Sequence, residues 1–166
     1  MSSEKTIYYL EMLDPDLHVA KDTPPGLVIE EACVKQYQVN RMLYELIGEN
    51  WDWNDKSNWT SSMWQEFAEV DSLRTWIAYN QGSIAGYFEL KSIDAQTNEI
   101  AYFGLAQKFI GKGYGGALLS RAIAEAWNWN HAERIIVNTC TLDHPHALAN
   151  YKARGFSVYK EVKQSQ

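Results

Sequence analysis

The sequence contains few cysteines, fewer basic than acidic residues and no long apolar segment. Among its 166 residues there are only two cysteines, Cys33 and Cys140, which cannot define a disulfide framework and are typical of a reducing compartment. Fifteen lysines and arginines against 21 acidic residues give a formal net charge of −6. This balance argues against a nucleic-acid partner, which needs a basic surface. Because no run suits a membrane span or a signal peptide, we expect a cytoplasmic protein without a membrane partner.

The length and composition are those of a globular domain with a core of its own. With 46% hydrophobic and 22% charged residues, a chain of this length can bury enough apolar surface to fold without disulfides. We therefore expect a single domain over residues 1–166. Pro24, Pro25 and Gly26 interrupt the chain early, so residues 6–26 are expected to form an additional N-terminal strand and a linker.

The hydrophobic pattern alternates between extended and helical segments. Extended patterns predict seven strands, which cover Ile7–Met12, Leu27–Cys33, Thr75–Tyr79, Ser83–Leu90, Asn98–Leu105, Arg134–Thr139 and Phe156–Val162. Helical spacing predicts four helices, which cover Val34–Ile47, Ser61–Val70, Gly113–Trp127 and Pro145–Arg154. The run Arg134–Thr139 (RIIVNT) is nearly continuous in apolar residues and is expected to be buried on both faces.

The order of these elements predicts an α/β fold with a central mixed β-sheet flanked by helices. The strands before and after the helix at Gly113–Trp127 are expected to lie parallel, joined by a right-handed crossover. The earlier strands form an antiparallel meander, in which Asn80–Gly82 marks a hairpin turn.

A glycine-rich segment, Ile110–Gly116 (IGKGYGG), joins a predicted strand to a predicted helix. Several glycines at such a junction leave backbone N–H groups at a helix N-terminus, where they and the helix dipole can hold phosphate oxygens. Lys112 adds a positive charge. The segment would otherwise be an ordinary flexible turn. A G-x-G-x-x-G dinucleotide motif fits the letters but not the context, because the segment follows five strands and the next strand ends without an acid. No Gly-Lys-Ser/Thr sequence occurs here, which excludes a Walker A loop.

Two motifs are similar to those of the GNAT superfamily of N-acetyltransferases. The segment Ile110–Gly115, followed by Ala117-Leu118-Leu119, resembles the acyl-CoA pyrophosphate loop Gln/Arg-x-x-Gly-x-Gly/Ala, with Ile110 in place of Gln or Arg. The second signature, Asn-x-x-Ala-Leu-x-x-Tyr-x-x-x-Gly-Phe, is matched at its later positions by Ala147-Leu148, Tyr151 and Gly155-Phe156, with His144 where Asn is common. The similarity extends over about residues 27–162.

The resemblance implies a GNAT-like acyl-CoA N-acyltransferase fold and acetyl-CoA as cosubstrate, with no metal. It implies transfer of the acetyl group by direct attack of a primary amine of a small molecule or peptide, in a monomer or homodimer. A non-catalytic CoA-binding sensor or scaffold is the alternative, for which Ile110 and His144 are the supporting departures. The residues that the resemblance assigns to the cosubstrate are Leu105, Gly111, Lys112, Gly113, Tyr114, Gly115, Gly116 and His144.

Two residues are candidates for proton transfer. A primary amine is mostly protonated at neutral pH, so a base assists its attack. Glu99 opens a strand where the family's histone acetyltransferases carry their base, although an ordinary solvated carboxylate would fit the position equally well. Tyr151 matches the family position near the CoA sulfur, where a phenol can protonate the leaving thiolate. Its alternative role is core packing on a short helix.

In the family that the sequence resembles, the two helices after the first strand wall the acceptor site, and the resemblance therefore implies an acceptor site in the aromatic segment Trp51–Trp64. Aromatic faces and nearby carboxylates suit an ammonium group, and Trp51 and Trp53 lie beside Asp52 and Asp55 in this segment. The alternative is that the tryptophans fill the core, which is the interpretation we favour for Trp59 and Trp64.

The segment Cys140–His146 contains a cysteine, an aspartate and two histidines, which together suggest either a metal site or a helix start. The chain offers no second ligand cluster, and Pro145 favours extended backbone at His144. We therefore predict a helix capped by Asp143 or His144, with Pro145 in its first turn.

The predicted strand at Ile7–Met12 is additional to the family pattern. GNAT proteins usually have one more strand after the one that begins near Gly155-Phe156, whereas this sequence stops at Gln166. We predict that the N-terminal strand pairs with the C-terminal part of the sheet and takes that place.

Overall fold

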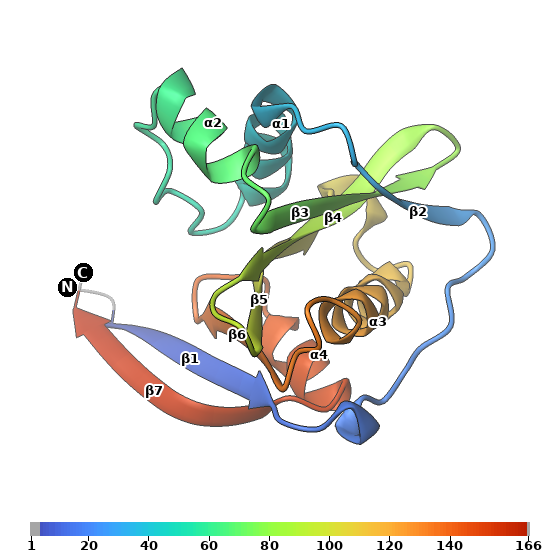
Figure 1. Cartoon of the computed structure of the whole chain (residues 1–166), viewed down its shortest axis with the longest axis vertical. Helices are drawn as coiled ribbons and strands as arrows, with labels where there is room; N and C mark the ends of the chain where they lie inside the picture. The colour runs from blue at the N-terminus through green and yellow to red at the C-terminus, as the bar shows by residue number, and fades with distance from the viewer. Residues whose placement is uncertain (1–3, 166) are drawn as a thin grey trace.

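A computed structural model describes residues 4–165, which form a seven-stranded sheet with four α-helices (Figure 1). The strand order is β2-β3-β4-β5-β6-β1-β7. The strands are β1 (Glu4–Met12), β2 (Leu27–Glu31), β3 (Leu73–Asn80), β4 (Ser83–Ser92), β5 (Thr97–Leu105), β6 (Arg134–Cys140) and β7 (Ser157–Ser165). The helices are α1 (Tyr37–Gly48), α2 (Ser61–Ala68), α3 (Tyr114–Trp127) and α4 (Ala147–Ala153), with 3-10 turns η1 (Pro15–Leu17) and η2 (Gln107–Phe109). The predicted mixed α/β architecture is confirmed.

The helices cover the two faces of the sheet. In Figure 1, α1 and α2 lie together on one side of β3 and β4, and α3 and α4 lie on the other. Strand β4 is buried from Ala85 to Leu90 because both faces are covered there. Phe88 packs in the core cluster that includes α3, whereas Tyr87 packs with Leu43 and Ile47 of α1. In the described part of the chain, residues 4–165, no helix is long and apolar enough to cross a membrane.

Strand β6 corrects one prediction. Ile135, Val137 and Thr139 are buried, but Asn138 between them is exposed. The expectation that this strand is buried on both faces is therefore wrong. The physical reason is its place in the sheet, because α3 and α4 pack on one face of β6 while α1 and α2 pack on β3, β4 and β5.

Strands β5 and β6 lie parallel, as predicted, but they remain paired over a short distance. The pairing joins Thr97–Glu99 to Arg134–Ile136. Strand β5 continues to Leu105 paired only with β4 on its other side. The residues of β5 after Glu99 thus have backbone groups that face a gap rather than a strand in residues 4–165. This divergence of two parallel strands creates the space for the site described below.

The additional N-terminal strand pairs with the C-terminal part of the sheet, and that prediction is confirmed. Strand β1 is antiparallel to β6, with Ile7 opposite Cys140, and antiparallel to β7, with Glu4 opposite Ser165. It therefore lies inside the sheet, and Leu10 and Met12 are fully buried. Burial of these side chains stabilises the half of the sheet that contains β6, which forms one wall of the gap.

Candidate functional site

A cavity of about 1030 Å³ occupies the gap between β5 and β6. Its walls come from the two diverging strands, from the loop before α3, from the segment between β6 and α4, and from the loop after α1. Most of the residues predicted for the site line this one cavity, namely Trp51, Trp53, Glu99, Leu105, Gly111, Gly115, Gly116, His144 and Tyr151. Lys112, Gly113 and Tyr114 lie in the same glycine loop (residues 110–116) but are not part of the cavity wall.

The glycine loop presents an open helix N-terminus. Gly113 is the N-cap of α3 with φ 81°, and Gly111 has φ 85°, backbone conformations that side chains rarely adopt. A Cβ at either position would project into open space, with no atom within 4 Å. No side chain caps the first N–H groups of the helix within the described chain. Unpaired N–H groups and unfilled space are what a phosphate needs at this point.

Lys112 and Tyr114 of the glycine loop contribute differently from its glycines. Lys112 lies with its ammonium 5.6 Å from the centre of the Phe109 ring. The Tyr114 hydroxyl accepts a hydrogen bond from the Asn80 side chain at 3.1 Å, so its side chain points toward the β3–β4 hairpin rather than into the loop. Only the backbone of Tyr114 is therefore available to an anion.

Leu105 is the last residue of β5 and lies beyond the part of that strand that pairs with β6. Its Cα lies opposite Gly86 of β4, and its side chain approaches Gly115 at the start of α3. The next backbone N–H, that of Ala106, already donates to the carbonyl of Ala85 at 2.8 Å. Gly86 lets β4 and β5 approach closely beside Leu105, since a Cβ on Gly86 would meet the carbonyl oxygen of Gly104 at 2.6 Å and the Leu105 side chain at 3.0 Å.

Glu99 is half-buried in the cavity wall, at the last position of β5 that pairs with β6. Burial raises the pKa of its carboxyl group, and the positive charges of Lys91 and Lys56 pull it back. Lys91 is the residue opposite Glu99 on β4. Within residues 4–165 the carboxylate has no hydrogen-bond or ion-pair partner. A half-buried carboxylate with a raised pKa and free oxygen atoms is suited to accept a proton from a bound ligand.

Tyr151 reaches the cavity from the other side of the gap. It is 6% exposed, and its ring packs against Phe103 of β5 and Phe156 before β7. Burial, with a smaller contribution from the negative charge of Asp143, raises the pKa of its phenol above the usual value of 10.0. The phenol therefore stays protonated throughout the physiological pH range and is available as a donor. Tyr151 therefore suits both predicted roles, because its ring is packed in the core and the residue also lines the cavity.

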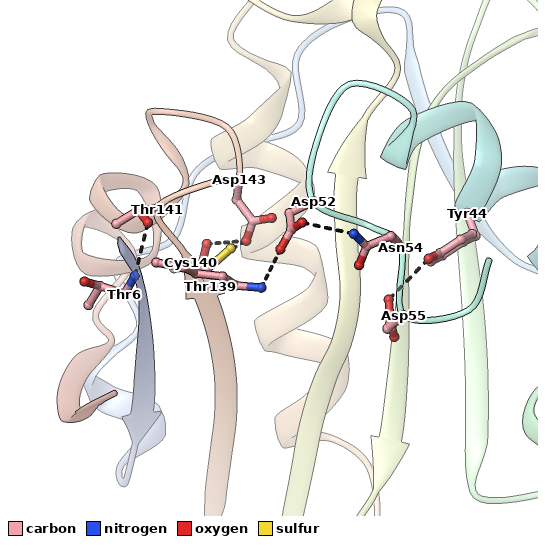
Figure 2. A network of polar contacts seen from close by, with 10 residues as sticks. Thr6, Tyr44, Asp52, Asn54, Asp55, Thr139, Cys140, Thr141 and Asp143 are labelled. Atoms are coloured by element: carbon pink, nitrogen blue, oxygen red, sulfur yellow. Dashed lines mark hydrogen bonds and ion pairs between the residues drawn. The ribbon is translucent and has the colours of Figure 1, made fainter. Parts of the chain in front are cut away.

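Helix α4 begins later than predicted. It starts at Ala147, after His146 as the N-cap, and neither Asp143 nor His144 caps it. The Asp143 carboxylate instead accepts hydrogen bonds from the Thr139 hydroxyl at 2.7 Å and the Cys140 N–H at 3.1 Å, so it closes the end of β6 (Figure 2).

The two histidines of this segment form a local contact. The His146 N–H donates to Nδ1 of His144 at 3.0 Å. Nowhere in residues 4–165 do three or more His, Cys, Asp or Glu side chains form a group that could hold a metal ion. The segment thus makes a tight turn between β6 and α4 and places His144 in the cavity wall.

The loop after α1, which we call the tryptophan loop (residues 49–60), lies across the gap. Asn50 donates to the Gln107 side chain in η2, on the β5 side. Trp51 contacts the His144 ring edge-on, with 5.2 Å between ring centres, on the β6 side. Trp53 packs between Tyr44 and Tyr102. The loop therefore connects both sides of the gap and covers one end of the cavity.

The other two tryptophans of the segment Trp51–Trp64 pack against each other. Trp64 is 2% exposed, and Trp59 packs edge-on against it at 5.3 Å between ring centres. The interpretation as core is confirmed for Trp64, whereas Trp59 is only half-buried. Trp51 and Trp53 instead line the cavity.

The carboxylates of the tryptophan loop are already paired with lysines of this chain. Asp52 forms an ion pair with Lys5 of β1, and Asp55 forms one with Lys56 at 3.0 Å. Figure 2 shows both carboxylates on the loop, with Asp55 directed toward Tyr44. Because Asp143 is also hydrogen-bonded, Glu99 is the one acid in the cavity wall without a partner in the described residues.

The Lys56 ammonium occupies an aromatic cage. It lies 4.4 Å from the Trp59 ring centre, with two further rings, those of Phe67 and Tyr102, at 4.7 and 4.6 Å. It also donates to the Tyr102 hydroxyl at 2.7 Å, and its side chain is 9% exposed. Asp55, one of the two carboxylates expected beside an acceptor ammonium, thus pairs with an ammonium of the protein itself, while the rings of the cage are not those of Trp51 and Trp53. Sequence reasoning missed Lys56, although it lies within the same aromatic segment.

Glu89 is a second buried acid, and it lies behind the cavity. It is 1% exposed, and burial raises the pKa of its carboxyl group from 4.5 to about 7, despite a hydrogen bond from Asn40 at 2.8 Å. An acid whose pKa is raised by folding stabilises the protein while it is protonated. That contribution is complete below about pH 4.5 and is lost as the pH rises through about 7.

We therefore predict that Glu89→Gln removes this pH dependence. The amide keeps the acceptor for Asn40 but cannot ionise, so the variant should match the parent protein near pH 5 and exceed its free energy of unfolding by up to about 3 kcal/mol near pH 8. Urea denaturation at the two pH values measures the difference. Glu66→Gln, on the exposed surface of α2, is the control and should change neither value. Parallel pH curves for the parent and Glu89→Gln would show that Glu89 is ionised in the fold.

Comparison with known proteins places this arrangement in a family. A sequence profile described as the acetyltransferase (GNAT) family matches residues 40–156. The match includes β5, the glycine loop, α3 and α4, which are the elements around the cavity. The chain therefore belongs to the GNAT family of acetyltransferases. A search of curated proteins found no match to the sequence.

Solved structures support the same fold. A GCN5-related N-acetyltransferase from Kribbella flavida superposes with a TM-score of 0.70 at 14% identity, over 97% of this chain and 58% of the other. A tandem GNAT protein from the clavulanic acid biosynthesis pathway gives a TM-score of 0.69 at 15% identity, over 99% and 54%. A GNAT acetyltransferase from Elizabethkingia anophelis, solved with acetyl-CoA bound, gives 0.62 at 20% identity, over 82% and 80%. The present chain thus spans little more than half of the first two proteins.

Proposed function

We propose that this protein is an acetyl-CoA-dependent N-acetyltransferase that acts on a primary amine. The observation that carries the proposal is the set of residues that border one cavity. An open glycine loop, an unpaired half-buried Glu99 and the buried phenol of Tyr151 all border it. The acetyl-CoA bound to the Elizabethkingia anophelis relative supports the choice of cosubstrate.

Each part of the cavity has a separate task in this proposal. The N–H groups of the glycine loop hold the CoA phosphates, and the free backbone edge of β5 near Leu105 binds the pantetheine arm. Acetyl-CoA supplies the acetyl group as a reactive thioester. Glu99, directly or through a water, accepts a proton from the acceptor ammonium, so that the neutral nitrogen can attack the carbonyl carbon. As the C–N bond forms and the C–S bond breaks, Tyr151 donates a proton to the leaving sulfur, and the second proton that the nitrogen loses on becoming an amide returns to the phenolate through water.

The acceptor binds at the tryptophan-loop end, between Trp51 and Trp53. Because the loop lies across the gap and its acids are paired, the acceptor meets aromatic rings and the Glu99 carboxylate rather than an open acidic surface. This environment suits a small amine or the flexible end of a peptide.

A thiol-release assay tests the proposal. The protein is mixed with acetyl-CoA and a panel of small amines, amino acids and peptides, and free CoA is measured against a no-acceptor control. At least one acceptor should raise thiol release well above hydrolysis. Binding of acetyl-CoA without release by any acceptor would instead support the sensor or scaffold alternative. Failure to bind acetyl-CoA at all would contradict both.

We expect Glu99→Gln to slow turnover most near neutral pH. The amide cannot accept a proton, so the variant depends on acceptor molecules that arrive already deprotonated. Their fraction grows with pH toward the amine pKa, and the defect should shrink from about 100-fold or more at pH 7 as the pH rises. The measurement is kcat/KM for the best acceptor between pH 6.5 and 9.5, with Glu161→Gln on exposed β7 as the control. A constant ratio of variant to parent across this range would remove Glu99 from proton transfer.

A further inference from the structure

The segment between β1 and β2, which we call the N-terminal linker (residues 13–26), is fixed against α3 and α4. The Val19 N–H donates to the Arg154 carbonyl at 3.0 Å. The Lys21 N–H donates to the Ser120 hydroxyl oxygen at 3.0 Å, and the same hydroxyl contacts Nε2 of His18 at 3.0 Å. Two contacts with the Ser120 hydroxyl of α3, one from His18 and one from the Lys21 N–H, therefore hold this part of the linker in place.

The side chain of Lys21 lies across the first turn of α3. A Cβ on Gly116 would come within 2.8 Å of the Lys21 Cδ and 3.3 Å of its Nζ, so the glycine leaves room for the lysine stem. Gly116 is also part of the cavity wall and is the last residue of the glycine loop. The ammonium of Lys21 is consequently held beside the helix end that offers unpaired N–H groups.

The Lys21 ammonium is available for a ligand. None of the ion pairs found in residues 4–165 includes it, whereas Arg121 on the same helix is paired with Glu125. The glycine loop itself offers a single cation, Lys112, which lies over the Phe109 ring. The side chain of Ile110, the first residue of the loop, has no polar atom that could bind a phosphate.

We propose that Lys21 binds a phosphate of acetyl-CoA and supplies the positive charge that Ile110 lacks. This inference rests on the proposed function, since it assigns a residue to the same cosubstrate. The phosphate is held jointly by the backbone N–H groups at the start of α3 and by the ammonium from the N-terminal linker. A segment outside residues 40–156, the range that the family profile matches, thereby becomes part of the cosubstrate site.

Calorimetric titration with acetyl-CoA tests this role without requiring turnover. Lys21→Met keeps the stem over Gly116 and removes the charge, so its Kd should rise about 10-fold at low salt, as expected for one charge-assisted contact. Lys21→Arg should restore most of the affinity. Lys160→Met removes a charge from β7, where the lysine contacts the Tyr9 ring, and should leave the Kd unchanged. Melting temperatures of all variants confirm that the fold is retained.

Titrations with two other ligands identify the phosphate that Lys21 contacts. S-Acetylpantetheine has no phosphate, so its affinity should be equal in the parent protein and in Lys21→Met. With acetyl-dephospho-CoA, a persisting defect assigns Lys21 to the pyrophosphate, and a vanishing defect assigns it to the 3′-phosphate. Ile110→Arg added to Lys21→Met should recover affinity for acetyl-CoA.

Three results would overturn the inference. If the parent protein binds acetyl-CoA and Lys21→Met binds it equally well, Lys21 has no role while the proposed function stands. An equal loss of affinity for S-acetylpantetheine in Lys21→Met would show a structural defect rather than a lost phosphate contact. No binding by the parent protein would remove the proposed function and this inference together.

Discussion

Tyr151→Phe should lower kcat by about 10²- to 10⁴-fold, the usual range for the loss of one general acid. The change keeps the ring that packs against Phe103 and Phe156 and removes only the hydroxyl group. Stability should therefore change little, and the affinity for acetyl-CoA should be nearly the same. Without the phenol, the departing sulfur must obtain its proton from water, which raises the barrier of the bond-breaking step. Steady-state kinetics with the best acceptor and calorimetric titration with acetyl-CoA give the two quantities.

The matched control for this experiment is Tyr159→Phe. Tyr159 lies on β7, is 44% exposed and is not part of the cavity wall. Its variant should have the parent kcat. Near-parental turnover in Tyr151→Phe would limit Tyr151 to core packing and leave protonation of the sulfur to water.

Gly113→Asp should abolish measurable binding of acetyl-CoA, which corresponds to a rise in Kd of roughly 100-fold or more. The carboxylate would project into the open space at the N-cap of α3 and repel the phosphates that the helix end attracts. Turnover should disappear with binding, because the cosubstrate no longer reaches the cavity. A thermal-shift titration to millimolar acetyl-CoA measures the loss.

Gly82→Asp separates charge repulsion from backbone strain. Gly82 lies in the β3–β4 hairpin with φ 83°, almost the same as the 81° of Gly113, and also has no atom within 4 Å of a Cβ. Both variants place an aspartate in the left-handed conformation, so both should lose a similar amount of stability. Only Gly113→Asp should lose acetyl-CoA. Comparable acetyl-CoA binding by both variants would mean that the phosphates lie elsewhere.

The fold could be predicted largely from local patterns. Apolar periodicity identified every strand and helix, and a turn of two residues with positive φ, Gln81 and Gly82, follows from the predicted hairpin. The parallel pairing of β5 and β6 follows from the crossover through α3. The start of α4 was misplaced because Asp143 had two possible sets of hydrogen-bond donors, and it binds the Thr139 hydroxyl and the Cys140 N–H instead of capping the helix.

The candidate site was predictable where its chemistry is carried by consecutive residues. The glycine loop is such a case, since its sequence alone specifies a helix start with free N–H groups. The pairings of Asp52 with Lys5 and of Lys56 with its cage depend on which side chains meet in space. Lys5 is 47 positions from Asp52, and no spacing rule connects them. The same holds for Lys21 and Gly116, which meet only because the N-terminal linker packs on α3.

The position of β1 within the sheet has a consequence for how the chain folds during synthesis. Strand β1 leaves the ribosome before its neighbours, yet both of them, β6 and β7, are made more than 120 residues later. The meander β2 to β5 can form from contacts that are close in sequence, whereas β1 must wait unpaired, with Leu10 and Met12 exposed, until Arg134–Cys140 has been made. Such long-range pairing is slow, and an unpaired apolar strand is prone to associate with other chains. We therefore expect the cavity wall formed by β6 to be completed last, so a nascent chain acquires its glycine loop before it acquires an enclosed site.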